Sequence, residues 1–369
     1  MPKLWFIIVS VILLHLDPCL SADGHCITSK AESGKCVHID RCPELKKLAY
    51  SPTISAAERN LLRISICGEQ MVCCADPLSP AENPIIKMNL DVSSEDYRMQ
   101  LPDPDDCGVN PPADRIYGGD ITALDQFMWT VALEFDVRGI RSVKCGGTLI
   151  NYRYVLTAAH CVKFVKPENL IALIGEYNLT SNPDCDEYNN CNPKVLRAQI
   201  QTITIHPEYR NRQKADIALL KLRQPLPEKY TKIINPICLP HSEALRRNLF
   251  THHNASVVGW GGHEDGISSE VKKYASLVIT TLDSCKKQYA NLYDTRKLTD
   301  NHLCARSVTD GFEDACKGDS GGPLMVNYGG NWFLVGIVSF GTECGIGKIP
   351  GIYTRVSSFM SWIEENLVE

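Results

Sequence analysis

The sequence has no excess of basic residues and no long basic run. Its 38 lysines and arginines are outnumbered by 43 aspartates and glutamates, which gives a net charge of −5 at pH 7. A protein that binds nucleic acid electrostatically normally carries a basic stripe or patch. The charge balance therefore argues against a nucleic-acid partner.

Long apolar runs are absent after the first twenty residues. The run Leu4–Leu14 follows Lys3 and is closed by Asp17 and Pro18, so it is short for a membrane anchor. A basic residue, a short apolar stretch and then small residues form the layout of a secretory signal peptide. We expect residues 1–21 to be that peptide, the protein to be extracellular, and no membrane partner.

The sequence also lacks internal repeats, low-complexity tracts and facing Cys-x-x-Cys pairs, which makes a cysteine metal site a weak alternative. It has 17 cysteines, and loss of Cys19 with the signal peptide leaves an even sixteen. An even number in a secreted chain predicts disulfides. Asn178 and Asn254 begin glycosylation sequons that suit the same compartment.

Residues 22–75 hold six closely spaced cysteines, separated by nine, five, twenty-four, five and zero residues. About fifty residues cannot bury a large core, so three disulfides make physical sense. Spacing alone leaves all fifteen pairings open. The next segment, residues 76–115, is rich in proline and acids without apolar periodicity, which predicts an exposed linker, tied down near its end at Cys107.

Residues 116–369 contain many short apolar runs separated by turn residues, among them 130–137, 148–160, 256–261 and 331–340. This pattern predicts an all-β barrel or sandwich. The last stretch has apolar residues at helical spacing and predicts a closing helix. These residues are Phe359, Trp362, Ile363 and Leu367.

Three polar residues in region 116–369 suggest nucleophilic catalysis. Ser320 stands among glycines in Gly-Asp-Ser-Gly-Gly-Pro, where the backbone can approach a substrate closely. A serine hydroxyl needs a base to take its proton, and His160 in Thr-Ala-Ala-His-Cys is the candidate. Asp216, an acid on an otherwise apolar strand, can orient that imidazole.

These three motifs, in the order His, Asp, Ser, resemble the chymotrypsin-type serine proteases. The resemblance implies a double β-barrel with a C-terminal helix. It also implies that His160, Asp216 and Ser320 are catalytic and that the backbone N–H groups of Gly318 and Ser320 form the oxyanion hole.

The same resemblance implies a substrate pocket. Asp314 would form its floor, Gly341 and Gly351 its walls, and Ser339 would belong to the strand that pairs with substrate. A carboxylate at the base of a narrow slot selects Arg or Lys. Phe340 and Lys317 replace residues that are commoner in the family, which affects subsite preference rather than chemistry.

Family protease domains begin with a motif like Ile116-Tyr117-Gly-Gly, although valine is usual where Tyr117 stands. The resemblance therefore implies an inactive precursor that is activated by cleavage between Arg115 and Ile116. The new α-ammonium group of Ile116 would pair with Asp319 and order the oxyanion hole.

Residues 22–75 resemble the clip domains that precede the protease domain in arthropod protease cascades, in particular the Easter, Grass and prophenoloxidase-activating group. Together the two resemblances imply a complete set of eight disulfides. The pairs are Cys26–Cys73, Cys36–Cys67, Cys42–Cys74, Cys107–Cys238, Cys145–Cys161, Cys185–Cys191, Cys285–Cys304 and Cys316–Cys344.

The proposed chemistry needs no cofactor, but the loop at residues 175–187 is rich in oxygen donors, and similar loops in related proteases bind calcium. Glu176 and Asp184 would supply carboxylates, and Asn178 and Thr180 carbonyl groups. An ordinary acidic surface loop is the alternative.

The resemblances imply a trypsin-like endopeptidase acting in an extracellular cascade such as melanization or Toll signalling. Its partners would be a downstream protein substrate, an activating trypsin-like protease and serpin-type inhibitors. Two alternatives stay open: a non-catalytic clip-domain adaptor and a digestive trypsin. The intact Ser320, His160 and Asp216 argue against the adaptor, and the clip-like module argues against bulk digestion.

Overall fold

The structure is a computed structural model of the chain, which divides into two compact units, residues 1–89 and 90–369. The described residues are 25–27, 33–49, 62, 65–68, 71–75, 101–103, 106–110, 121–227, 233–261, 269–290, 294–308, 319–341 and 349–367. No helix among them is long and apolar enough to cross a membrane. The expected signal peptide lies outside them.

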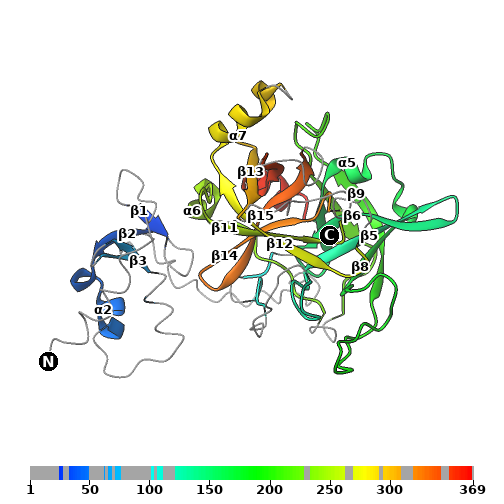
Figure 1. Cartoon of the computed structure of the whole chain (residues 1–369), viewed down its shortest axis with the longest axis horizontal. Helices are drawn as coiled ribbons and strands as arrows, with labels where there is room; N and C mark the ends of the chain where they lie inside the picture. Colours follow the sequence, from blue (N-terminus) through cyan, green and yellow to red (C-terminus); the bar gives the residue numbers. More distant parts are fainter. Residues whose placement is uncertain are drawn as a thin grey trace, which may run out of the picture. The chain divides into compact units, whose positions relative to one another are not determined.

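The first unit is a small antiparallel sheet with strand order β1-β2-β4-β3, drawn in blue in Figure 1. Its core consists mainly of Ile39, Leu45 and Val72, and two disulfides, Cys36–Cys67 and Cys42–Cys74, cross it. So few apolar residues cannot stabilise a fold alone, and the disulfides supply the rest. Its elements are β1 (His25–Ile27), β2 (Ser33–His38), η1 (Ile39–Arg41), α2 (Pro43–Ala49), β3 (Ile66–Gly68) and β4 (Met71–Ala75).

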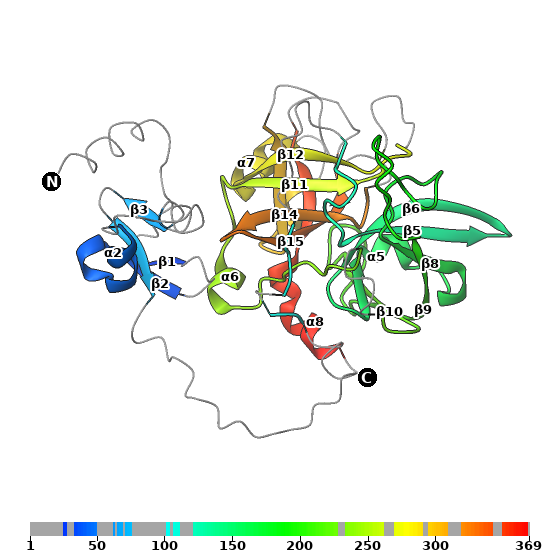
Figure 2. The ribbon, with the colours of Figure 1, turned by 90° about the horizontal axis from the view of Figure 1, so that it is seen from below.

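The second unit contains two closed antiparallel barrels of six strands each, which lie side by side in Figure 2. The expected all-β double barrel is therefore confirmed. The first barrel has the order β10-β7-β6-β5-β8-β9. Its strands are β5 (Thr130–Val137), β6 (Ile140–Leu149), β7 (Tyr154–Thr157), β8 (Leu170–Ile174), β9 (Leu196–Ile205) and β10 (Ala218–Leu222).

The second barrel has the order β11-β12-β13-β16-β15-β14. Its strands are β11 (Asn254–Gly259), β12 (Lys273–Thr280), β13 (His302–Ser307), β14 (Pro323–Tyr328), β15 (Asn331–Phe340) and β16 (Gly351–Arg355). Closure of both barrels leaves no sheet edge open to solvent, and alternate residues of each strand point into the interior.

Short helices connect the strands, and the chain closes with η5 and α8, which confirms the expected C-terminal helix. Phe359 and Ile363, two residues of its apolar pattern, are buried against the core that links the barrels. The remaining helices are α5 (Ala159–Val162), η2 (Pro167–Asn169), α6 (Glu243–Arg247), α7 (Leu282–Tyr289), η4 (Thr295–Lys297), η5 (Val356–Phe359) and α8 (Met360–Glu365).

The end of the expected linker is tied down at Cys107, as expected. Cys107 is buried and forms a disulfide with Cys238. The next residue, Gly108, donates its N–H to the carbonyl of Pro236 at 2.9 Å, and its carbonyl accepts from the N–H of Trp332 at 2.9 Å. Because Gly108 has φ of 62° and lies against the Trp332 backbone, a side chain would not fit there.

Candidate active site

His160 and Asp216 form a buried pair in the first barrel. His160 lies in the short helix α5, which follows β7, and Asp216 lies two residues before β10 begins. Nδ1 of His160 lies 2.7 Å from Oδ2 of Asp216, and the backbone N–H of His160 donates to Oδ1 at 2.8 Å. A carboxylate at Nδ1 holds the proton there, so Nε2 carries the lone pair that a general base needs.

The second barrel supports this carboxylate. The hydroxyl of Ser339 in β15 donates to Oδ2 of Asp216, and the hydroxyl of Thr354 in β16 donates to the Asp216 carbonyl at 2.9 Å. Sequence analysis assigned Ser339 to the substrate strand and missed this bond. It also missed Thr354, because no motif marks a threonine in the middle of a strand.

Ser320 lies beside α5. Its carbonyl oxygen accepts the N–H of Gly146 in β6 at 2.8 Å and lies 3.5 Å from Sγ of Cys161. The next residue, Gly321, has φ of 81°, and a Cβ there would overlap the hydroxyl of Thr157. The glycine therefore permits the close approach that brings Ser320 to the neighbourhood of His160.

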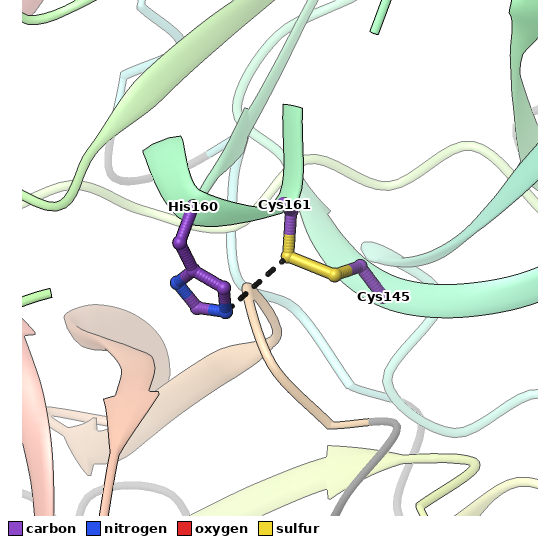
Figure 3. A group of neighbouring side chains, drawn as sticks. All are labelled: Cys145, His160 and Cys161. Atoms are coloured by element: carbon purple, nitrogen blue, oxygen red, sulfur yellow. Dashed lines mark hydrogen bonds between the residues drawn. A yellow bond between two sulfur atoms is a disulfide. The ribbon is translucent and has the colours of Figure 1, made fainter. Parts of the chain in front are cut away.

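Among the described atoms, no hydrogen bond joins the Ser320 hydroxyl to Nε2 of His160. Nε2 instead lies 3.8 Å from Sγ of Cys161, the contact drawn in Figure 3. Hydrogen bonds between nucleophile and base are often long without substrate and tighten in the complex. The arrangement therefore suits a serine that meets its base when substrate binds.

His160 also lies close to two cysteine sulfur atoms, those of Cys145 and Cys161 (Figure 3). These sulfurs are bonded to each other, with an S–S distance of 1.99 Å. A metal ligand must be a thiolate, so the disulfide excludes metal binding at these three residues. The disulfide instead links α5 to β6, and so holds the short helix that carries His160 in place.

Asp319, the residue expected to receive a new amino terminus, accepts a hydrogen bond from the N–H of Gly261 at 2.8 Å. A Cβ at Gly259 or at Gly261 would overlap its carboxylate oxygens. These two glycines therefore form a close-fitting seat for the Asp319 carboxylate. Ile116, its expected partner, lies outside the described residues.

Of the expected pocket residues, Gly341 and Gly351 lie against each other, since a Cβ at Gly341 would be 3.7 Å from Cα of Gly351. Ser339 is buried in β15. The other expected site residues, Asp314, Gly318 and Arg115, lie outside the described residues, as does the Cys316–Cys344 pair.

Six of the eight expected disulfides are present in the described part of the chain. Besides the four already given they are Cys185–Cys191 and Cys285–Cys304. Cys73 is also disulfide-bonded, but the side chain of its expected partner Cys26 lies outside the described residues. Of the two sequon asparagines, Asn254 is exposed at the start of β11 and Asn178 is half-buried.

The expected calcium residues lie in one loop between β8 and β9. Asp184 is buried and accepts hydrogen bonds from the N–H groups of Tyr177 and Asn178, at 3.0 and 3.2 Å, and from the hydroxyl of Ser181 at 2.6 Å. Burial, together with the negative charge of the neighbouring Asp184, raises the pKa of Glu176 to about 7. Thr180 is exposed and donates its hydroxyl to Oδ1 of Asn178 at 2.7 Å.

Two crowded carboxylates are a donor set that a hard cation prefers, and carboxylate oxygens have lone pairs beyond those used here. The residues thus fit a calcium ion, for which Glu176 and Asp184 would be the charged ligands. Bound there, calcium would neutralise charge and order the loop.

Comparison with known families agrees with this geometry. Residues 116–363 match the family described as Trypsin, and residues 26–74 match the regulatory CLIP domain of proteinases. The first match covers more than half of the chain.

Several curated proteins match this chain over nearly its whole length. Melanization protease 1 of Drosophila melanogaster is 32% identical over 99% of this chain and 99% of its own length. The Spaetzle-processing enzyme of the same fly is 35% identical, with 93% and 92% covered. Phenoloxidase-activating factor 3 of Holotrichia diomphalia is 33% identical, with 94% and 95% covered. The chain therefore belongs to the trypsin family of serine proteases, as a member with an amino-terminal CLIP domain.

Proposed function

We propose that the chain is the secreted zymogen of an endopeptidase that cleaves after Arg or Lys in an extracellular proteolytic cascade. The observation that carries the proposal is the buried His160–Asp216 pair beside the Ser320 backbone. A buried carboxylate is costly unless it is paired and hydrogen-bonded, and buried titratable pairs of this kind cluster at functional sites.

The catalytic roles follow from this arrangement. Ser320 attacks the scissile carbonyl while Nε2 of His160 accepts its proton, and His160 later returns that proton to the leaving amine. Asp216 holds the imidazole tautomer and stabilises its charged form. The N–H groups of Gly318 and Ser320 bind the oxyanion, at about 2.7–4 kcal/mol of transition-state stabilisation for each donor.

Specificity for basic side chains rests on Asp314, since a carboxylate at the floor of a pocket pairs with an Arg or Lys ion. Gly341 and Gly351 lie against each other and carry no side chains, so neither would block a long substrate side chain that reaches for this carboxylate. Bulky residues at either position would close the slot.

Activation is assigned to the Arg115–Ile116 bond. Cleavage there releases an α-ammonium group on Ile116, and the seat formed by Gly259 and Gly261 positions Asp319 to receive it. Pairing of the two charges then orders the segment that carries the oxyanion hole. The protease that cuts after Arg115 is expected to be trypsin-like itself.

The names of the relatives suggest the setting. They refer to melanization, to activation of phenoloxidase and to processing of Spaetzle. We infer a downstream zymogen or pro-ligand as substrate in one of these immune cascades, and serpin-type proteins as inhibitors. A small docking domain such as the CLIP unit suits recognition of a specific partner better than bulk digestion.

Peptide hydrolysis tests the specificity. The full chain, cut after Arg115, is assayed on fluorogenic peptides that differ only in Arg, Lys or Phe before the scissile bond. Arg and Lys peptides should be cleaved and the Phe peptide should not. Asp314→Ser should lose the Arg and Lys activity, whereas the matched change Asp310→Ser should keep it. Full Arg activity in Asp314→Ser would refute the assignment.

The adaptor alternative is separated from the protease by active-site titration of the cut protein, because an adaptor would show no titratable serine. The digestive alternative is separated by incubation with candidate zymogens and amino-terminal sequencing of the products. A cascade enzyme cuts one bond in one of them, whereas a digestive enzyme cuts many.

A further inference from the structure

A cavity of about 360 Å³ lies between two segments of the protease domain. One wall is the loop between β9 and β10, and the other runs from the end of η4 to the start of β13. Ala215 and His302 are its buried lining residues, whereas the others are exposed, apart from the half-buried Gln213. The two barrels therefore form this cavity jointly, and it is open to solvent.

The cavity adjoins the candidate active site. Its lining residue Ala215 directly precedes Asp216, the acid of the candidate catalytic pair. The ring of His302 lies edge-on to the ring of Phe340, with 6.3 Å between the ring centroids. Phe340 follows Ser339 at the end of β15, the strand proposed to pair with substrate. A substrate that runs along this strand therefore passes close to the cavity.

Basic side chains dominate the lining. Arg210, Lys214 and Lys297 contribute three positive charges, and Glu208 is the one acidic residue among the described residues that line the cavity. Nζ of Lys214 lies 3.8 Å from Oε2 of Glu208, and both side chains are exposed, so this ion pair is weak. Nη1 of Arg210 donates to two backbone carbonyls of its own loop, at 3.2 and 3.0 Å, which hold the guanidinium without neutralising its charge. The cavity therefore keeps a net positive charge.

A carboxylate matches this lining. The planar guanidinium of Arg210 can bind both oxygens of a carboxylate, and the lysine ammonium groups add positive charge. A cationic side chain would be repelled there. The volume lies at the small end of the range for ligand pockets, which suits a single side chain. Uncharged hydrogen-bonding residues complete the lining; these are Asn211, Gln213, Thr299 and Asn301.

We propose that this cavity is a second specificity site, which binds an aspartate or glutamate of the protein substrate shortly before the scissile bond. The inference rests on the proposed function, because it needs a substrate that runs along β15. The slot at Gly341 and Gly351 would take the Arg or Lys, and the cavity would take the acid. A sequence with both charges is rarer than a basic residue alone, so such an enzyme would cut few of the bonds open to it.

Peptide hydrolysis by the full chain, cut after Arg115, tests the proposal. The fluorogenic peptides have Arg before the fluorophore and carry Glu, Gln or Lys at one of the three preceding positions. At one of these positions the Glu peptide should be cleaved with a kcat/KM about fivefold or more above that of the Gln peptide, and the Lys peptide should be poorest. Equal kcat/KM for Glu and Gln at all three positions would overturn the proposal. A protein that cleaves none of the peptides would overturn the proposed function, and this inference with it.

Charge reversal assigns the preference to the cavity. In Arg210→Glu/Lys297→Glu the Lys peptide should become a better substrate than the Glu peptide, while cleavage of the Gln peptide should change little. Both residues are exposed, so this variant should fold. The matched control is Arg296→Glu, at an exposed residue beside Lys297 that does not line the cavity, and it should keep the Glu preference. An unchanged Glu preference in the double variant, or its loss in Arg296→Glu, would overturn the assignment to the cavity.

Discussion

Asp216 is buried, and the groups that hold it come from distant parts of the chain. Its carboxylate is bound by the backbone and ring of His160 and by the hydroxyl of Ser339, and its carbonyl by the hydroxyl of Thr354. Because two of these donors belong to the second barrel, the orientation of the imidazole depends on how the barrels pack. The acid is therefore positioned before any substrate arrives.

Gly261 supports a prediction about activation. A methyl group there would overlap the Asp319 carboxylate, so Gly261→Ala should displace the acid that is expected to bind the new amino terminus. We expect correct cleavage after Arg115 but at least about tenfold lower peptidase activity, since orientation of the oxyanion hole is lost.

The contrasting variant is Gly139→Ala in the β5–β6 turn. Gly139 has φ of 82° and no atom within 4 Å of an added Cβ, so this change should cost some stability and no activity. Activity assays and thermal melts of both variants check the pattern. Unchanged activity of cut Gly261→Ala would contradict the proposed seat.

His302 supports a prediction about pH. Burial lowers the pKa of this imidazole, although hydrogen bonds that the ring makes to the backbone and the charge of Asp216 oppose the shift. A folded-state pKa below the unfolded value favours the neutral form in the folded protein. Its stabilising contribution is therefore complete above about pH 6.5 and is lost as the pH falls below that value.

His302→Gln cannot titrate, so the fall in melting temperature between about pH 7.5 and about pH 5 should be smaller than in wild type. His206, whose pKa burial also lowers, remains in both proteins and causes part of the fall. The exposed His252 provides the control change His252→Gln. Equal acid sensitivity of His302→Gln and wild type would show that His302 is not responsible.

At the scale of single residues, the sequence predicted those candidate catalytic residues that belong to a recognisable motif. His160, Asp216 and Ser320 stand in short patterns that nucleophilic catalysis requires. Thr354 and Gly261 could not be predicted, because each acts through a contact with a residue far away in the chain. Such contacts exist only once the barrels have closed.

At the scale of elements, regular strands were predicted better than turns. The runs 130–137 and 331–340 coincide with β5 and β15, because uninterrupted β-formers lie between clear turn signals. The run 148–160 contains instead the end of β6, a turn, β7 and the start of α5. In that turn Oδ1 of Asn151 accepts the N–H groups of Arg153 and Tyr154, at 2.9 and 2.7 Å. A polar side chain that accepts hydrogen bonds within its own turn does not change the spacing of apolar residues, so the apolar pattern could not predict this turn.

Strand β5 supports a prediction about stability. Leu133 lies in its middle with none of its surface exposed, within the core that joins the two barrels. Leu133→Ala should lower the free energy of unfolding by about 2–5 kcal/mol, through lost burial and the cavity left behind. Val137, at the exposed end of the same strand, provides the control change Val137→Ala, expected within about 0.5 kcal/mol of wild type. Denaturant unfolding measures both, and equal effects would contradict the described core.

At the scale of the whole molecule, the site is divided between two barrels. His160 and Asp216 belong to the first, whereas Ser320 and the strand carrying Ser339 belong to the second. Alternating apolar runs predicted β structure, but closure into two barrels came from the family resemblance, and the six strands of each barrel came from the structure. Strand order depends on pairings between distant segments, which periodicity does not encode.

The disulfide Cys107–Cys238 spans the proposed activation bond, because Cys107 lies on the amino-terminal side of that bond and Cys238 lies in the protease domain. The two pieces of the cut chain should therefore migrate together on a non-reducing gel and separate after reduction. Cys107→Ser/Cys238→Ser should release the amino-terminal piece after cleavage without reductant. Retention of that piece in the double variant would show that another contact holds it.

Covalent labelling of the nucleophile tests the central claim most directly. The full chain, before and after cleavage at Arg115–Ile116, is treated with a fluorophosphonate that reacts with activated serines, and the label is located by peptide mapping. We predict stoichiometric labelling of Ser320 in the cut protein, little in the uncut protein and none in Ser320→Ala. An unlabelled Ser320 in protein with a verified Ile116 amino terminus, or equal labelling of the Ser320→Ala variant, would contradict the account.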